Sequence, residues 1–393
     1  MERIYLIYLI IEGLLLYFSL QLTRKNEIRL FEQFHLITVY ENNTIGRSIR
    51  VLIGRVLLLI SYGIYMVFSV FKVIDPLTAA HDAYYYQARF EEINENSSLL
   101  SFVFKEHHEF EIGFELFYWI CKKISTDYHV FLAVLFTITF IIYVIFIKKL
   151  YTKSHSLFSI CAIFLLLISQ FNTMRMTISI GISLCMIILL RDEKWKAAVA
   201  TAFIAVLFHL TAIILFPMIV VNYIVVNRTR VSFKKLRLLI IGGMIIAVSS
   251  IGILNRLLIG TSKEEYIGSS GSLAYGTYTI IFIIMILAAR RYKDFSELAP
   301  INRTIISVLP VCLCCIPLQY SVQMIYRMTL FFNPLIIGSI PSILKVYSKR
   351  DRLEDWCVTI FMNFYVVFRI YSFFTEELQY VGIYSNSLLT WLK

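Results

Sequence analysis

The chain has 393 residues, of which 59% are hydrophobic and only 16% are charged, and its net charge at pH 7 is +11. Soluble globular domains carry about 25% charged residues, so this composition excludes a soluble enzyme and indicates an integral membrane protein. Repeated apolar runs of about 17–25 residues have the length of membrane-spanning helices, whereas the alternating ten-residue strands of an outer-membrane barrel are absent. The predicted fold class is an all-α, polytopic helical bundle in a membrane.

The basic residues gather in short segments between the apolar runs. Six segments hold 24 of the 37 Lys and Arg residues but fewer than half of the acidic residues: 23–50, 148–155, 191–196, 227–238, 290–303 and 345–354. This spread over separate loops follows the positive-inside rule, and it differs from the single basic surface of a nucleic-acid-binding protein. We therefore expect these loops in the cytoplasm, and we expect no nucleic-acid partner.

The crossings follow from this topology, with the N-terminus outside. Apart from a region near residue 209, the predicted crossings in chain order are 4–20, 51–73, 128–147, 156–172, 176–190, 238–254, 277–289, 304–320, 328–345 and 356–374. They belong to a single polytopic domain, 1–393, with external loops at 74–127 and 255–276. The first loop contains an amphipathic, aromatic stretch at 112–124 that suits an interfacial or re-entrant helix.

Residues 197–226 are an anomaly between two basic loops. One crossing would put these loops on opposite sides of the membrane, while two full helices with a turn need about 40 residues. We predict two short helices that form a broken hairpin, with its apex near His209 and with Pro217 breaking or kinking the return. Counting this hairpin as two gives about 12 transmembrane segments.

Ionisable groups at membrane depth are costly and mark functional sites, and five of them fall on or near the predicted external face. They are Asp82, Glu111, Arg175, His209 and Arg327. Arg175 begins an inward helix, where a guanidinium can bind an oxyanion or a pyrophosphate through paired hydrogen bonds. Arg327 is a second candidate phosphate ligand. Either arginine can instead be an interfacial anchor that reaches lipid headgroups.

The other candidates suit work on a sugar. His209 can accept a proton from an attacking hydroxyl or, as imidazolium, bind phosphate; the alternative is a hydrogen-bonded histidine between helices. Asp82 with Tyr84–Tyr86 resembles a sugar-binding patch, because a carboxylate accepts hydrogen bonds from hydroxyls and aromatic rings stack on sugars. The alternative there is a wet loop with interfacial tyrosines. Glu111 is a candidate substrate-side carboxylate.

A metal site near Glu111 is disfavoured. Glu111 and Glu115 are one helical turn apart, and with His107 and His108 they could bind a divalent cation. No close-set group of ligands supports that interpretation. We expect no metal and no cofactor. Nucleotide-binding motifs such as Walker A are also missing.

The order of several short motifs resembles a known family. The motifs are Asp82-x-Tyr84-Tyr85, Glu111 in Glu-x-Gly-Phe, Met174-Arg175, Leu207-Phe208-His209 and Tyr326-Arg327. Over roughly residues 1–375 they resemble the EpsG-like branch of Wzy-type polymerases of O-antigen, capsule or exopolysaccharide. The resemblance implies a multi-pass enzyme of the bacterial inner membrane whose architecture resembles that of lipid-dependent (GT-C-like) glycosyltransferases. Its active site would face the periplasm or exterior.

The resemblance also implies a reaction and roles for the residues. The growing glycan would be transferred from undecaprenyl pyrophosphate to the non-reducing end of the next lipid-linked repeat unit. The pyrophosphate ligands would be Arg175 and Arg327; the base would be His209, Asp82 or Glu111; and the sugar-binding residues would be Tyr84, Tyr85 and Tyr326. The partners would be the lipid-linked donor and acceptor and membrane lipid, with a chain-length regulator as a further candidate.

Two alternatives stay open. Another lipid-linked glycosyltransferase, or an O-antigen ligase, would use the same pyrophosphate chemistry with a different acceptor. A polysaccharide or lipid transporter (flippase) would carry out no chemistry. Such a transporter should show inverted repeats with broken helices in both halves, whereas the sequence indicates one obvious break.

Overall fold

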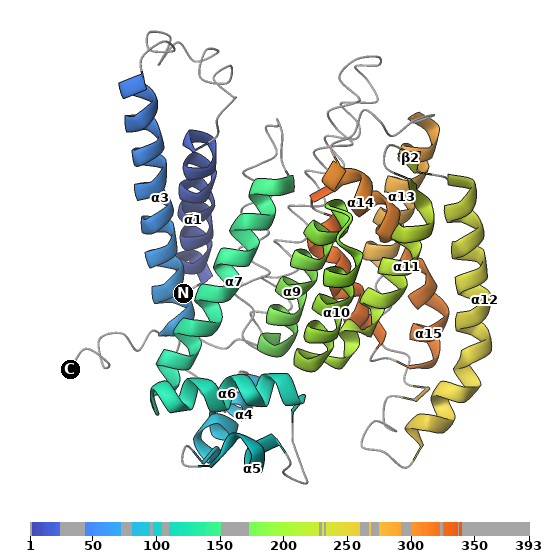
Figure 1. The fold of residues 1–393 in the computed structure, drawn as a ribbon, viewed down its shortest axis with the longest axis horizontal. Helices are drawn as coiled ribbons and strands as arrows, with labels where there is room; N and C mark the ends of the chain where they lie inside the picture. Colours follow the sequence, from blue (N-terminus) through green and yellow to red (C-terminus); the bar gives the residue numbers. More distant parts are fainter. Residues whose placement is uncertain are drawn as a thin grey trace. The chain divides into compact units, whose positions relative to one another are not determined.

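The computed structural model describes most of the chain, and nearly all of the described part is helical (Figure 1). The described residues are 2–23, 44–71, 81–94, 97–103, 110–150, 173–227, 230–231, 233–259, 267–268, 275–291, 300–322, 325–336 and 338–339. Within them the strands are β1 (Val226–Asn227) and β2 (Arg230–Val231), which form one short antiparallel pair. The predicted helical fold class is confirmed.

Five helical stretches of the described chain are long and apolar enough to cross a membrane. They are Ser48–Val70, Tyr128–Lys149, Met174–Arg191, Lys234–Leu257 and Pro300–Gln319. Shorter apolar helices cover Ile11–Leu20, Trp195–Phe208, Leu210–Val225 and Thr277–Ile286. Each of these stretches overlaps a predicted crossing, while the predicted crossings 156–172 and 356–374 lie outside the described residues. The protein is a helical membrane protein with several membrane-capable helices.

Packing divides the chain into two units. Unit 1 comprises Met1–Phe102, Phe117–Met174 and Thr359–Lys393. Unit 2 comprises Val103–Leu116 and Arg175–Val358. The boundary passes within α6 (Ile112–Ile124), so the start of this helix and the segment before it belong to unit 2.

Unit 1 is built on long apolar helices that pack lengthwise. Its helices, besides the end of α6, are α1 (Glu2–Leu22), α3 (Thr44–Val70), α4 (His81–Glu92), α5 (Leu99–Val103) and α7 (Tyr128–Leu150). The helix α3 packs against both α1 and α7. The Tyr62 hydroxyl lies 2.7 Å from Thr137 Oγ1, and the Tyr65 ring stacks on Phe140 at 5.2 Å between centroids.

An aromatic cluster joins α4, the end of α6 and α7 within unit 1. The ring of Phe131 lies 5.6 Å from Phe90 and 4.6 Å from Tyr118, and all three side chains are fully buried. The Tyr118 hydroxyl donates a hydrogen bond to the carbonyl oxygen of Tyr86 at 3.0 Å. The sequence predicts one helix between residues 74 and 127, but α4 and α5 are present there as well as α6.

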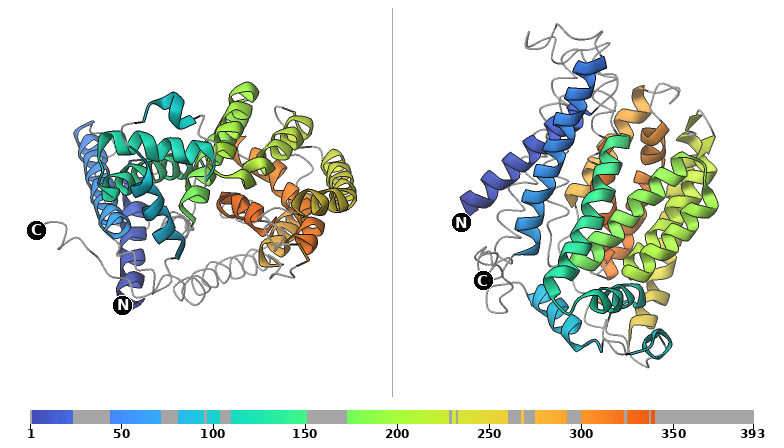
Figure 2. Two further views of the ribbon diagram at one scale, coloured as in Figure 1. Left: turned by 90° about the horizontal axis from the view of Figure 1, so that it is seen from below. Right: turned by 60° about the vertical axis from the view of Figure 1, so that its left-hand side comes forward.

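Unit 2 contains the remaining elements. Besides β1 and β2, they are α9 (Met174–Arg191), α10 (Trp195–Phe208), the 3-10 helix η2 (Leu210–Ile214), α11 (Leu215–Val225), α12 (Phe233–Leu258), α13 (Tyr275–Arg291), α14 (Pro300–Val308), the 3-10 helix η5 (Leu309–Cys314), α15 (Cys315–Ser321), α16 (Tyr326–Thr329) and the 3-10 helix η7 (Leu330–Phe332). Buried Val225, Leu236 and Ile306 form a core where α11, α12 and α14 meet. Figures 1 and 2 show α9, α10 and α11 side by side.

The helices α10 and α11 form a hairpin with His209 at its closed end. The ring of Trp195 lies 5.1 Å from Tyr223, and Phe203 lies 4.8 Å from Phe216, so the two helices run antiparallel. At His209 the backbone is extended, with φ −158° and ψ 120°, and η2 then leads into α11. Pro217 lies in the first turn of α11, where a missing N–H is tolerated. The chain is therefore interrupted at His209, ahead of the proline.

A second interruption, which is not predicted from the sequence, lies within the stretch Pro300–Gln319. Here α14 is followed by η5 and then by α15. Pro310 and Pro317 have no N–H to donate to the preceding turn, which explains why a single regular helix does not continue through them. On α12, a Cβ at Gly243 would lie 2.8 Å from the Sγ atom of Cys314, so glycine permits this close approach to η5. Both interruptions belong to unit 2.

Candidate functional site

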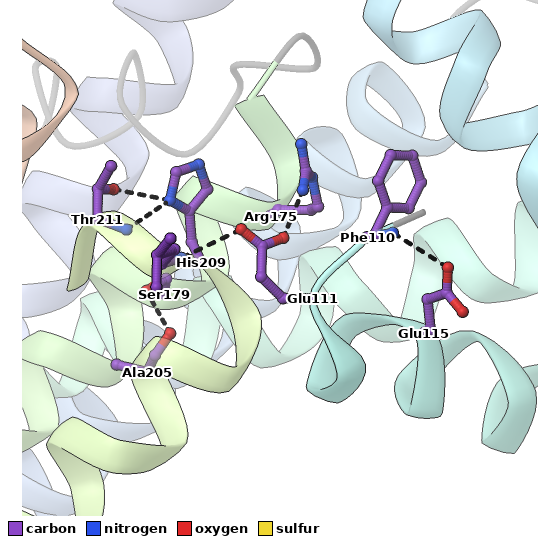
Figure 3. Close-up of polar contacts among 9 residues, drawn as sticks. Phe110, Glu111, Glu115, Arg175, Ser179, Ala205, His209 and Thr211 are labelled. Carbon is purple, nitrogen blue, oxygen red and sulfur yellow. Dashed lines mark hydrogen bonds and ion pairs between the residues drawn. The ribbon is translucent and has the colours of Figure 1, made fainter. Parts of the chain in front are cut away.

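Three of the predicted site residues lie together at one end of unit 2 (Figure 3). Glu111 directly precedes α6, Arg175 is in the first turn of α9, and His209 lies between α10 and η2. The Oε2 atom of Glu111 is paired with the guanidinium of Arg175. Its Oε1 atom accepts a hydrogen bond from the backbone N–H of Leu210 at 3.1 Å. One carboxylate therefore links three segments that are distant in the sequence.

Gly113 allows the start of α6 to approach the end of α10. A Cβ on this residue would lie 2.7 Å from the carbonyl oxygen of Leu207, closer than real side chains come. The carbonyl oxygen of Glu111 accepts hydrogen bonds from the N–H groups of Phe114 at 2.9 Å and Glu115 at 3.1 Å. The backbone of Glu111 is therefore held by α6, and the close contact beside it brings this residue within reach of Leu210.

The Arg175–Glu111 pair is partly buried, since the side chain of each residue is 21% exposed. The guanidinium also lies over the ring of Phe110, with Cζ 4.4 Å from the ring centroid. Burial alone would raise the pKa of the Glu111 carboxyl, but the charge of Arg175, a smaller electrostatic contribution from His209 and the backbone hydrogen bond from Leu210 lower it below its usual value of 4.5. Glu111 is therefore ionised at neutral pH. Its contribution to stability is present above pH 4.5 and is lost as the pH falls through the lowered pKa.

Hydrogen bonds orient the ring of His209, which is buried. Its Nδ1 atom accepts a hydrogen bond from the backbone N–H of Thr211 at 3.3 Å and lies 2.7 Å from the Thr211 hydroxyl. A ring nitrogen that accepts from an N–H carries no hydrogen, so this network assigns the hydrogen of the neutral ring to Nε2. His209 thus caps η2 with one nitrogen and has a donor at the other.

Glu115 has partners of its own. It is fully buried, and its Oε1 atom accepts a hydrogen bond from the backbone N–H of Phe110 at 3.1 Å. Glu111 instead contacts Arg175 and Leu210, so the two carboxylates are engaged separately (Figure 3). His107 and His108 lie outside the described residues.

Arg327 and Tyr326 are on α16, which packs against η2 and against α15. Both residues are therefore at the same end of unit 2 as His209. The Arg327 side chain is half-buried, and Tyr326 is exposed. Within the described ranges of the chain, no acidic side chain forms an ion pair with Arg327.

Asp82, Tyr84 and Tyr85 are on α4, in unit 1. Tyr84 and Tyr85 are both exposed, whereas the neighbouring Tyr86 is buried. The sequence predicts that these residues share one external site with Arg175 and His209, which belong to unit 2. That grouping stays a prediction.

Two side chains that contribute to the site are not predicted from the sequence, and neither is the backbone contact of Leu210. Phe110 lies under the guanidinium of Arg175, and Thr211 contacts His209. The contact of Thr211 has a recognisable signal in its spacing from His209, because a side chain in a turn can accept the backbone N–H two residues further along. Phe110 carries none, since its contact depends on a residue far away in the sequence.

Comparison with protein families finds that residues 77–386 match the EpsG family. The chain belongs to the EpsG family. Members of this family are Wzy-like polysaccharide polymerases. The matched region includes Glu111, Arg175 and His209. The helices α1 and α3 lie before the matched region, whereas the resemblance noted in the sequence extends over roughly residues 1–375. Comparisons with curated proteins and with solved structures find no match.

In this EpsG-family chain, the groups around Glu111 are mainly hydrogen-bond donors. Arg175 and the N–H of Leu210 donate to the carboxylate, and His209 has a donor at Nε2. Donors that are fixed before a ligand arrives can stabilise negative charge as it develops on a leaving group. Arginine in particular matches the geometry of phosphate oxygens. The cluster is suited to bind a phosphate group.

Proposed function

We propose that this protein polymerises the repeat units of a surface polysaccharide. It transfers the growing glycan from undecaprenyl pyrophosphate to the non-reducing end of the next lipid-linked unit. The observation that carries the proposal is the donor cluster of Arg175, Leu210 and His209 in a chain of the EpsG family. The enzyme has about 12 transmembrane segments, a GT-C-like architecture and a location in the bacterial inner membrane.

The charges at the two ends of the hairpin support an active site on the outer face. Trp195 belongs to the basic segment 191–196 and Tyr223 precedes the basic segment 227–238, and their rings lie side by side at the open end. His209 lies at the closed end. The positive-inside rule assigns the basic end to the cytoplasm, so the cluster faces the periplasm or exterior.

The reaction is a group transfer between two lipid-linked sugars. The acceptor hydroxyl oxygen bonds to the anomeric carbon of the donor, and the bond from that carbon to the pyrophosphate oxygen breaks. Undecaprenyl pyrophosphate leaves with the bonding electrons and is held by Arg175 and Arg327, while His209 donates from Nε2 to a phosphate oxygen. A carboxylate, Glu111 or Asp82, accepts the hydroxyl proton. The exposed tyrosines Tyr84, Tyr85 and Tyr326 contact the sugars.

Deletion of the gene tests this function. In a strain that makes the polysaccharide, we expect the surface glycan ladder to collapse to a single repeat unit, because units are still assembled and exported. The ladder is measured by gel electrophoresis of surface glycan. Total loss of surface glycan would instead indicate a transporter or an early assembly enzyme. Long polymer that stays on its lipid carrier would indicate a ligase.

Replacement of Thr211 tests how His209 is held. Thr211→Val keeps the shape of the side chain and the backbone N–H but removes the hydroxyl 2.7 Å from Nδ1. We expect a polymerisation rate about tenfold lower, because a buried hydrogen bond is lost. Thr211→Ser keeps the hydroxyl and should restore the rate at an equal amount of membrane protein. Equal polymerisation rates for the valine and serine variants would mean that the Thr211 hydroxyl has no part in the mechanism.

A further inference from the structure

The donor cluster of unit 2 already holds an anion, which is the protein's own carboxylate. Glu111 places one oxygen on the Arg175 guanidinium and the other on the Leu210 N–H, at 3.1 Å. Guanidinium and backbone N–H groups bind carboxylate and phosphate oxygens in the same manner. The position that the proposed function assigns to a phosphate oxygen is therefore the position that Glu111 fills.

We propose that, while no substrate is bound, the Glu111 carboxylate takes the place of the phosphate of the lipid-linked sugar donor. In the resting enzyme its carboxylate occupies the site, and the pyrophosphate of the donor displaces it from Arg175 and Leu210. The displaced carboxylate then accepts the proton of the acceptor hydroxyl. This inference rests on the proposed function, and it adds an order of events, since the donor must bind before the base is released.

The exchange needs only a side-chain rotation. The backbone of Glu111 is fixed, because its carbonyl oxygen accepts the first N–H groups of α6 and because Gly113 is in close contact with Leu207. The hydrogen-bond donors of the site do not have to move either. Arg175 lies over the ring of Phe110, and Leu210 begins η2. With 21% of the carboxylate side chain exposed, an incoming ligand can reach it.

Release changes the chemistry of the carboxylate. While Glu111 is bound, the charge of Arg175 holds its pKa below the usual value and makes it a poor base. After release it loses that charge and the hydrogen bond from Leu210, while burial and the phosphate charge now disfavour its ionised form. The affinity of the Glu111 carboxylate for a proton therefore rises when the lipid-linked sugar donor is bound. Proton transfer from the acceptor hydroxyl is thereby coupled to occupation of the phosphate site.

Removal of the internal anion should strengthen ligand binding. We would measure the dissociation constant of undecaprenyl pyrophosphate on the purified full-length protein in nanodiscs. Glu111→Gln should bind about tenfold more tightly than the wild type, because the site no longer has to be vacated, and its polymerisation rate should fall. Equal or weaker binding would overturn the inference, since Glu111 would then be a support for Arg175.

Three further measurements separate the possible outcomes. Glu115→Gln neutralises a buried carboxylate in the first turn of α6, four residues after Glu111, and should leave the dissociation constant unchanged. If Arg175→Ala binds like the wild type, the proposed phosphate site fails, whatever Glu111 does. If Glu111→Gln does not fold, an infrared difference spectrum of the wild type decides the question. Ligand addition should shift a carboxylate band, and a spectrum without such a shift contradicts the exchange.

Discussion

Arg175→Ala should abolish long-chain polymer while single repeat units still reach the surface. The guanidinium is in the first turn of α9, pairs with Glu111 and lies over Phe110, so it is held in place before a ligand binds. Loss of one such preorganised donor typically lowers a rate by about 10²–10³. A ladder of surface glycan would contain the single unit and little else. Polymer of normal length distribution would exclude this arginine from the site.

The alanine variant needs controls, because it leaves the partly buried carboxylate of Glu111 without its arginine. The double variant Arg175→Ala/Glu111→Gln removes that unpaired charge, and it should still lack long polymer. Arg191→Ala changes an arginine at the opposite end of the same helix, where the side chain donates to Asp192. This control should give a normal ladder. A short ladder in the Arg191 variant would mean that damage to α9, rather than lost phosphate binding, explains the effect.

His209→Asn should lower the polymerisation rate about 10²-fold without loss of folded protein. Asparagine is a good helix-capping residue, and its side-chain oxygen can accept the N–H of Thr211 as Nδ1 does. It has no group at the position of Nε2. The variant therefore keeps the hairpin turn and removes the donor proposed to act on phosphate. The rate is measured per amount of protein in the membrane.

A second histidine variant completes the comparison. His209→Ala removes both the cap and the donor, so it should lose activity and also thermal stability in detergent. If His209→Asn has full activity while His209→Ala is unstable, the histidine is a cap and not part of the active site. The two results together separate the structural contribution of Nδ1 from the chemical contribution of Nε2.

Composition and charge account for the helical class and the membrane character of the chain. An apolar fraction of 59% with only 16% charged residues cannot form an ordinary soluble surface. The turn at His209 can be inferred from length and charge. Residues 197–226 are too few for two full helices, and a single crossing would put the basic loops before and after them on opposite sides of the membrane. Both features are thus encoded in local length and charge.

The details of the site depend on contacts that no local pattern encodes. Glu111 and Arg175 are 64 residues apart, and the contact of Glu111 with Leu210 accompanies the close approach of Gly113 to Leu207. The hydrogen on Nε2 of His209 follows from an acceptor contact of Nδ1 with Thr211, which sequence spacing suggests but does not fix. The interruption at η5 cannot be inferred from the number of residues, because the stretch Pro300–Gln319 has an ordinary length for one crossing.

A reconstituted reaction gives the most direct measurement. Lipid-linked single units, extracted from the deletion strain, are supplied to purified protein in liposomes, and glycan length and released undecaprenyl pyrophosphate are followed together. The wild type should lengthen the glycan and release one carrier for each unit added, while Arg175→Ala should do neither. Wild-type protein that neither lengthens the glycan nor releases the carrier, or an Arg175→Ala protein that does both at the wild-type rate, would contradict a polymerase built around this phosphate site.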